Sequence, residues 1–307
     1  MTVMNYTSHG KLLLTGEYLV LNGAVALALP VCLGQSMTVA PLETFHNKSL
    51  RWDAHTPDAP WFSATLDKTS LEILVTDDPS KAERLKKILK AVQELNPSAF
   101  GQALHFVTHL DFDPEWGLGS SSTLISNLAQ WAKVDPYKLL KMTFGGSGYD
   151  IACATADSPI FYQLVEGQPR TEKAMFHPSF SEHLFFVYQG KKQNSAKEVS
   201  HFKMRMQDKD LSQEIVEISD ISRALPDAND LPMFCSLLDQ HEAILSRCLD
   251  HEPLKSQYPD FPGTIKSLGA WGGDFFLAAT AWDETAVKAY FTAKGLEVIV
   301  PYKNFVS

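Results

Sequence analysis

Cysteine is scarce in this chain, and long apolar runs are missing. The four cysteines form no Cys-x-x-Cys pair, which argues against a disulfide framework and against a zinc knuckle. The longest apolar stretch, residues 24–34, contains Pro30 and falls well short of the ~18 residues that a membrane span needs. No basic segment leads into an apolar core at the N-terminus. We therefore expect a cytoplasmic protein without a secretory signal.

Positive charge is also in deficit, with 27 basic against 36 acidic residues and a formal net charge of −9. Nucleic acid and anionic membranes both require a dense basic face, so neither is the expected partner. A small anionic ligand is still allowed, because a few backbone amides and one or two lysines can bind a phosphate. The ten histidines form no His-Glu-x-x-His arrangement, so a zinc hydrolase is not supported.

The composition is that of a folded protein, because 45% of the residues are hydrophobic. The length of 307 residues is enough for about two domains. Strands are predicted at 11–15 and 17–21, and Asn22-Gly23, directly after the second, is a strong signal for a hairpin turn. The apolar spacing predicts helices over 80–95 and 121–132. Further strands in the first half are predicted at 37–41, 61–66, 71–76 and 103–110.

The second half follows a different pattern. A strand at 183–189 precedes helical stretches at 195–225 and 231–249. Strands at 264–268 and 275–281, a helix at 284–294 and a strand at 296–301 follow. This order is the split β-α-β pattern of ferredoxin-like domains. The boundary is expected near residue 170, giving domains of 1–170 and 171–307.

A glycine-rich segment, Gly117-Leu-Gly-Ser-Ser-Ser-Thr123, lies between a predicted strand and a predicted helix. Glycines allow close approach of the backbone to a ligand, and the amides at a helix start bind anions without a lysine. The segment is neither a Walker A loop nor a Gly-x-Gly-x-x-Gly fingerprint. On its own it could equally be a tight turn with a serine N-cap.

Three further features could carry chemistry. Asp150 follows the glycine-rich segment 145–148 and could accept a proton, or it could simply favour a first helical turn. Asp274 ends a second glycine-rich segment, 269–274, which could face a phosphate or form a hairpin loop. Lys11 opens a strand, where it could neutralise a phosphoryl group or extend along the surface to solvent.

Taken in order, these segments resemble the three motifs of the GHMP kinases, a superfamily that includes the galactose, homoserine, mevalonate and phosphomevalonate kinases. The resembling stretches are Gly10-Lys-Leu-Leu-Leu-Thr-Gly-Glu-Tyr18, Trp116-Gly-Leu-Gly-Ser-Ser-Ser122 and Gly269-Ala-Trp-Gly-Gly-Asp274. The resemblance implies an α+β fold with an N-terminal domain like domain 2 of ribosomal protein S5 and a ferredoxin-like C-terminal domain. Gly16-Glu-Tyr18 and Gly146-Ser-Gly-Tyr-Asp-Ile-Ala152 look most like the phosphomevalonate kinases.

The resemblance also implies roles for individual residues. Asp150 would orient or deprotonate the acceptor hydroxyl, and Lys11 would lower the pKa of that hydroxyl and steady the phosphoryl group. ATP would be bound by Gly117, Leu118, Gly119, Ser120, Ser121 and Ser122, with Ser121 also a ligand of Mg²⁺. The acceptor would be held by Glu17, Tyr18, Ser147, Gly148, Lys191, Lys192, Ser195, Gly272, Gly273 and Asp274.

The implied activity is Mg-ATP-dependent phosphorylation of mevalonate or phosphomevalonate in isoprenoid precursor synthesis. The expected partners are ATP and a small alcohol, with no nucleic acid or membrane, and the expected state is a monomer or homodimer. Two departures leave alternatives open. Trp271 occupies a glycine position of the third motif. Mevalonate kinases have a Mg²⁺-binding glutamate ahead of the segment that resembles 146–152, whereas no acid lies between Asp135 and Asp150 here. A kinase for a sugar or another small alcohol, or a non-catalytic nucleotide-binding homologue, therefore stays possible.

Overall fold

The structure is a computed structural model that describes residues 3–42, 48–193 and 195–306. The chain forms two compact units, and each is described by itself. The first comprises Met1–Gly10, Leu33–Pro114 and Leu118–Thr155, and the second comprises Lys11–Cys32, Glu115–Gly117 and Ala156–Ser307. The predicted domains of 1–170 and 171–307 stay a prediction. No helix in the described ranges combines the length and apolarity needed to cross a bilayer.

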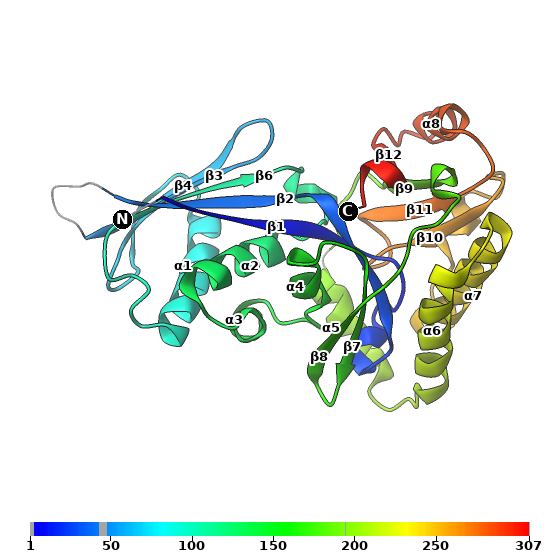
Figure 1. Cartoon of the computed structure of the whole chain (residues 1–307), viewed down its shortest axis with the longest axis horizontal. Helices are drawn as coiled ribbons and strands as arrows, with labels where there is room; N and C mark the ends of the chain where they lie inside the picture. Colours follow the sequence, from blue (N-terminus) through cyan, green and yellow to red (C-terminus); the bar gives the residue numbers. More distant parts are fainter. Residues whose placement is uncertain (1–2, 43–47, 194, 307) are drawn as a thin grey trace. The chain divides into compact units, whose positions relative to one another are not determined.

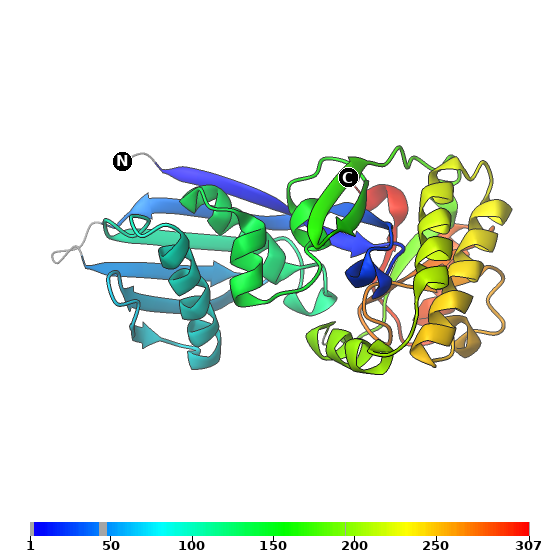
Figure 2. The same cartoon turned by 90° about the horizontal axis from the view of Figure 1, so that it is seen from below.

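The first unit is a β-sheet covered on one face by helices (Figures 1 and 2). Its hydrogen-bonded order is β5-β4-β3-β6-β2, with β1 pairing with β2, and β3 runs parallel to β6. The strands are β1 (Met4–Leu13), β2 (Ala26–Pro41), β3 (Ser49–His55), β4 (Pro60–Asp67), β5 (Ile73–Thr76) and β6 (Leu104–Leu110). Only residues 4–10 of β1 and 33–41 of β2 belong to this unit. The helices are α1 (Pro79–Leu95), α2 (Ser120–Ala132), α3 (Pro136–Thr143) and α4 (Tyr149–Ala154).

Local sequence explains why α1 forms where it was predicted. The Asp78 carboxylate accepts a hydrogen bond from the Lys81 N–H, and Pro79 occupies the first helical turn. Leu85, Leu89 and other apolar residues of the inner face are buried in the core of this unit. Burying each such side chain contributes about 1.5–3 kcal/mol. The helix predicted over 80–95 is therefore confirmed.

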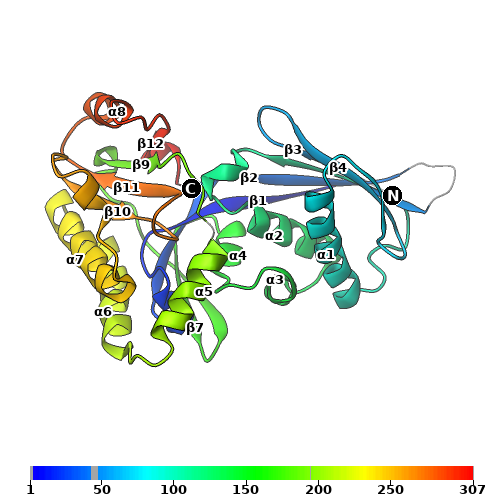
Figure 3. The same ribbon diagram turned by 180° about the vertical axis from the view of Figure 1, so that it is seen from behind.

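The second unit contains a four-stranded antiparallel sheet in the order β10-β11-β9-β12. Numbered along the chain, these strands stand in the order 2-3-1-4, which confirms the predicted split β-α-β pattern. The strands are β9 (Leu184–Tyr188), β10 (Thr264–Ser267), β11 (Phe275–Ala279) and β12 (Ile299–Pro301). The helices are α5 (Ser195–Met206), α6 (Ser212–Ala224), α7 (Leu231–Leu249) and α8 (Glu284–Thr292), and Figure 3 shows α7 beside β10. The β7–β8 pair (Ile160–Val165 and Gln168–Lys173) joins the first residues of β2.

Several predicted elements were wrong. The strand expected at 17–21 is in part a 3-10 turn, Leu19–Asn22, and the expected hairpin at Asn22-Gly23 is the end of that turn, where Gly23 has a φ of 94°. The strand predicted at 37–41 is confirmed, but it is only the last third of the sixteen-residue β2. The helix expected over 195–225 is two helices, α5 and α6, separated by 207–211.

Candidate active site

The helix α2 begins directly after a glycine in the left-handed region, Gly119, which has a φ of 95°. Gly119 offers no side-chain cap, and the first-turn N–H groups of 120–122 have no carbonyl partner within the helix. Such a helix start attracts anions. The Ser122 hydroxyl is buried and donates to the Gly119 carbonyl at 2.8 Å, whereas Ser121 is only half-buried. Leu118 is buried, so it would meet a nucleotide only through its backbone.

Asp150 lies in the first turn of α4, which also begins after a left-handed glycine, Gly148. Its carboxylate accepts a hydrogen bond from the Ile151 N–H at 3.1 Å, and the residue is half-buried, as is Ser147. Burial, and then the charge of Asp150, raise the pKa of the Tyr137 phenol to about 12. The Asp150 carboxylate is therefore held at a helix start where a ligand could reach it.

In the second unit, Lys11, Gly117 and Asp274 form a tight contact. The Lys11 ammonium donates to the Gly117 carbonyl at 2.8 Å. A Cβ at position 117 would overlap the Asp274 carboxylate, and the φ of 69° there also requires glycine. Burial raises the pKa of Asp274, while the Lys11 charge opposes that rise. The lysine and the carboxylate therefore fix the backbone at Gly117, the first residue of the predicted phosphate loop.

The segment after β9 is bound to the glycine-rich loop that ends at Asp274. The Gln193 N–H donates to the Asp274 carboxylate at 3.0 Å, and the Asp274 N–H donates to the Lys191 carbonyl at 2.9 Å. The Gln193 side-chain amide donates to the Trp271 carbonyl at 2.7 Å. Lys191 and Lys192 are exposed, and Lys192 lies 3.8 Å from Glu115. The backbone of Lys191 and the charge of Lys192 therefore both act on Asp274.

Trp271 packs into the interior of the second unit. Its side chain is 6% exposed and belongs to an apolar cluster with Tyr18, Phe202 and other buried residues. Its backbone N–H donates to the Tyr18 hydroxyl at 3.2 Å. Its burial in this cluster favours a role for Trp271 as an anchor of the glycine-rich loop.

The second unit also contains a fully buried ionisable cluster. The Lys266 ammonium is 2.6 Å from one oxygen of Glu17 and 3.2 Å from an oxygen of Glu242. The other Glu17 oxygen is 3.3 Å from Nε2 of His241, and that same nitrogen accepts a hydrogen bond from the Gly16 N–H. Because Nε2 is an acceptor here, the imidazole is neutral.

Burial dominates the titration of this cluster. It raises the pKa of Glu17 to about 7 even though Lys266 opposes the shift. It also raises the pKa of Glu242, and it holds the pKa of His241 well below its usual value. Glu17 and Tyr18 thus have partners inside the protein, and their predicted contact with the acceptor stays a prediction.

The predicted residues divide between the two units. The second unit holds one cluster made of Lys11, Gly117, Lys191, Lys192, Gly272, Gly273 and Asp274, with Glu17 and Tyr18 buried in the same unit. The first unit holds Leu118, Gly119, Ser120, Ser121, Ser122, Ser147, Gly148 and Asp150. Ser195 is the first residue of α5, and its side chain lies outside the described part of the structure.

The sequence did not indicate two residues that hold the glycine-rich loop and the buried ionisable cluster in place. Gln193 holds the glycine-rich loop through two hydrogen bonds, and only its position between Lys192 and Ser195 could have pointed to it. Lys266 lies in β10, a strand whose four residues are all buried, and a buried lysine requires an ionic partner. Among the described residues, no group of three or more His, Cys, Asp or Glu side chains is arranged to hold a metal ion.

Comparison with known proteins finds similarity in structure. No family model and no curated protein matches the sequence. The mevalonate kinase of Methanococcus jannaschii superposes with a TM-score of 0.70 at 16% identity, over 97% of this chain and 96% of that one. The Streptococcus pneumoniae phosphomevalonate kinase in complex with phosphomevalonate and AMPPNP gives a TM-score of 0.69 at 16% identity, over 97% and 98%.

A Lactococcus lactis galactokinase complexed with galactose is more distant, with a TM-score of 0.59 at 13% identity, over 97% of this chain and 92% of that one. These structures are GHMP kinases, and each aligns along nearly the whole chain. At such low identity the likeness is one of fold. The chain has the GHMP kinase fold.

Proposed function

We propose that this protein is a Mg-ATP-dependent kinase that phosphorylates the hydroxyl of mevalonate or phosphomevalonate. The start of α2 supports the proposal most directly, because its uncapped amides follow Gly119 and its Ser121 hydroxyl is half-exposed. Phosphoryl transfer depends mainly on positioning and on neutralising charge, and an anion-binding helix start provides both for a nucleotide. The fold shared with kinases of this class agrees with that reading.

In the proposed reaction, the bond between the γ-phosphorus and its bridging oxygen breaks and a bond to the acceptor oxygen forms, leaving ADP. Asp150 accepts the proton of the acceptor hydroxyl. Lys11 neutralises charge on the transferred group, and its contact with the Gly117 carbonyl fixes its position.

Mg²⁺, bound with ATP, would neutralise charge on the phosphates. The Ser121 hydroxyl fits a ligand role, because it is half-exposed at the helix start while the Ser122 hydroxyl already donates to Gly119. The remaining ligands would be nucleotide oxygens and water, as is usual for this ion.

The two exposed cations, Lys191 and Lys192, favour an acceptor that already carries an anionic group. Both mevalonate and its phosphate satisfy this. A sugar kinase is the second candidate, because the galactokinase shares the fold. A non-catalytic homologue is the third, and the glycine replaced by Trp271 is the feature that favours it.

The test is ADP release from Mg-ATP with mevalonate and phosphomevalonate in parallel, and with galactose and homoserine as controls. Turnover with one of the first two is the expected result. Turnover only with galactose would support the sugar kinase. Calorimetric ATP binding without turnover on any of the four would reject the proposed acceptors.

The role of Asp150 is tested by Asp150→Asn, with Asp157→Asn as the control because Asp157 is exposed. Loss of the base should lower kcat by about 10²–10⁴-fold while ATP binding persists. The control should keep its activity. Equal turnover of the two variants would remove Asp150 from the catalytic role.

A further inference from the structure

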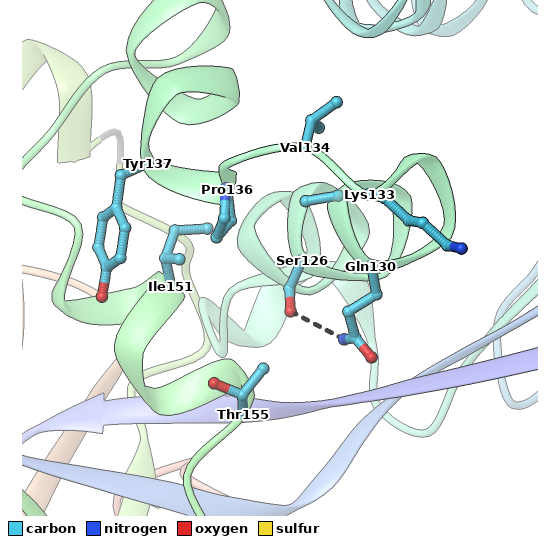
Figure 4. A pocket seen from close by; sticks show the side chains of 9 residues that line it. Ser126, Gln130, Lys133, Val134, Pro136, Tyr137, Ile151 and Thr155 are labelled. Atoms are coloured by element: carbon cyan, nitrogen blue, oxygen red, sulfur yellow. Dashed lines mark hydrogen bonds between the residues drawn. The ribbon is translucent and has the colours of Figure 1, made fainter. Parts of the chain in front are cut away.

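The first unit contains a cavity of about 300 Å³ between α2, α3 and α4. Its lining residues are uncharged except for Lys133, and Figure 4 shows the Lys133 side chain pointing away from the others. Charge gathers instead in the second unit, around the carboxylate of Asp274. Lys11 and Lys192 are the cations that act on this carboxylate, and Glu115 is the anion.

The backbone of Asp274 and its carboxylate are both held in place by the segment after β9. The Asp274 N–H donates to the Lys191 carbonyl, and its own carbonyl accepts from the Gln189 N–H at 2.9 Å. Its carboxylate accepts from the Gln193 N–H at 3.0 Å, and the residue is only 8% exposed. The φ of Asp274 is 54°, a left-handed conformation that is uncommon outside glycine and is often found at functional sites.

Gly117 brings Lys11 and Asp274 to the same place. The Lys11 ammonium donates to the Gly117 carbonyl at 2.8 Å, and the Asp274 carboxylate occupies the space where a side chain at position 117 would lie. Burial raises the pKa of Asp274, and the charge of Lys11 is the strongest influence that lowers it. The carboxylate is therefore a fixed anion close to a cation that the proposed reaction uses.

A fixed anion matters to a lysine because its ammonium is a compact charge on a flexible stem. Without a restraint, such an ammonium would bind the phosphates of ATP before the reaction begins. Binding that is equally strong in the ground state and in the transition state does not accelerate the chemical step. A carboxylate that holds Lys11 at Gly117 prevents this.

We propose that Asp274 is a positioning residue for Lys11, whose ammonium it holds at Gly117 for the transferred phosphoryl group and restrains from binding ATP beforehand. The proposal deepens the proposed kinase function and rests on it. It gives Asp274 a role that is exerted through Lys11, in place of the acceptor contact that the resemblance implies.

The main test is Asp274→Asn, which removes the charge and little else. Asparagine has a similar volume, tolerates the left-handed backbone, and can still accept from the Gln193 N–H. The kcat for ADP release should fall about 10²-fold, because Lys11 loses its restraint. ATP, measured by calorimetry, should bind as tightly as to the wild type or more tightly, because an anion near the phosphates is gone.

This split between kcat and ATP affinity separates positioning from a structural role. Loss of structure would weaken ATP binding together with kcat, and that result would overturn the proposal. A kcat at or above the wild-type value would overturn it as well.

A control and a second variant accompany the test. Asp260→Asn makes the same change at a carboxylate of the second unit that is 62% exposed and lies 3.6 Å from Lys294, and it should leave both quantities within about twofold. Asp274→Gly suits a φ of 54° and also removes the carboxylate, so it replaces the asparagine variant if that one does not fold. Wild-type kcat in Asp274→Gly would contradict the proposal.

The last measurement needs no turnover. Lysine is labelled with ¹³C at Cε, and the Lys11 resonance is identified by its absence in Lys11→Arg. In Asp274→Asn this resonance should titrate about one pH unit lower than in the wild type, because a nearby anion stabilises an ammonium. An unchanged titration would overturn the proposal. If no acceptor is turned over but the shift is found, the proposed function fails and the contact between Asp274 and Lys11 stands, so the two failures are distinguished.

Discussion

Removing the cation of the buried cluster, by Lys266→Met, should be among the most destabilising single changes in the second unit. The Lys266 side chain is fully buried, and its ammonium lies 2.6 Å from Glu17 and 3.2 Å from Glu242. Methionine fills similar volume, so cavity formation contributes little. The loss arises because two carboxyl groups are left buried without a cation.

The expected size follows from that geometry. Breaking a buried ion pair by removing one partner costs about 3–5 kcal/mol, which is a large part of the ~5–15 kcal/mol that stabilises a typical domain. The pKa of Glu17 is already raised to about 7, and Lys266 is the main group that lowers it. The cost should therefore grow as the pH rises through neutrality, because Glu17 must then either ionise without a partner or keep its proton.

The assay is urea unfolding followed by circular dichroism at about pH 6 and about pH 8. The double variant Glu17→Gln/Lys266→Met should recover at least ~1 kcal/mol of the loss, because it removes one of the stranded carboxylates. Lys288→Met is the control, since Lys288 is half-exposed in its pair with Glu284 and should change stability by no more than ~0.5 kcal/mol.

Two results would refute this reasoning. A loss below about 1 kcal/mol for Lys266→Met would mean that the carboxyl groups are solvated or repacked at little cost. A double variant no more stable than the single one would mean that Glu17 does not carry the penalty.

Three further outcomes are expected. Between about pH 4.5 and 7, folded Glu17 keeps a proton that the unfolded chain has lost, so the contribution of Glu17 to the free energy of unfolding falls as the pH rises. His241 acts in the opposite direction. It is held neutral in the folded protein, so its contribution falls as the pH drops below 6.5 and the unfolded chain takes up a proton. Each effect changes the free energy of unfolding by at most about 1.4 kcal/mol per pH unit, and the two oppose each other. In urea titrations, Glu17→Gln should therefore show the His241 effect alone, with stability falling as the pH drops. A pH profile parallel to that of the wild type would contradict this. Trp271→Gly should cost about 3–5 kcal/mol in thermal or urea unfolding, since the buried ring leaves a cavity; higher turnover at unchanged stability would show instead that the ring obstructs a ligand. Ser121→Ala should raise the Mg²⁺ concentration needed for half-maximal ADP release, and an unchanged titration would count against Ser121 as a ligand.

Elements governed by local signals were predicted well. The helix α1 follows from the periodicity that places Leu85 and Leu89 on one face and from the cap at Asp78. The start of α2 follows from a glycine ahead of consecutive serines. Errors occur where neighbouring structure overrides local preference. The stretch after Glu17 has strand-forming residues, but it turns at Leu19–Asn22, where Leu19 and Val20 are buried by residues distant in the chain.

The sequence alone predicted the order of elements in the second half and the position of the glycine-rich loops. Each of these depends on residues close together in the chain. The tertiary structure decided the rest: that Asp274 packs on Gly117, that Trp271 is buried beside Tyr18, and that Lys266 meets Glu17. These partners are separated by 150 or more positions, and only the folded chain can bring such residues into contact and remove their charges from water.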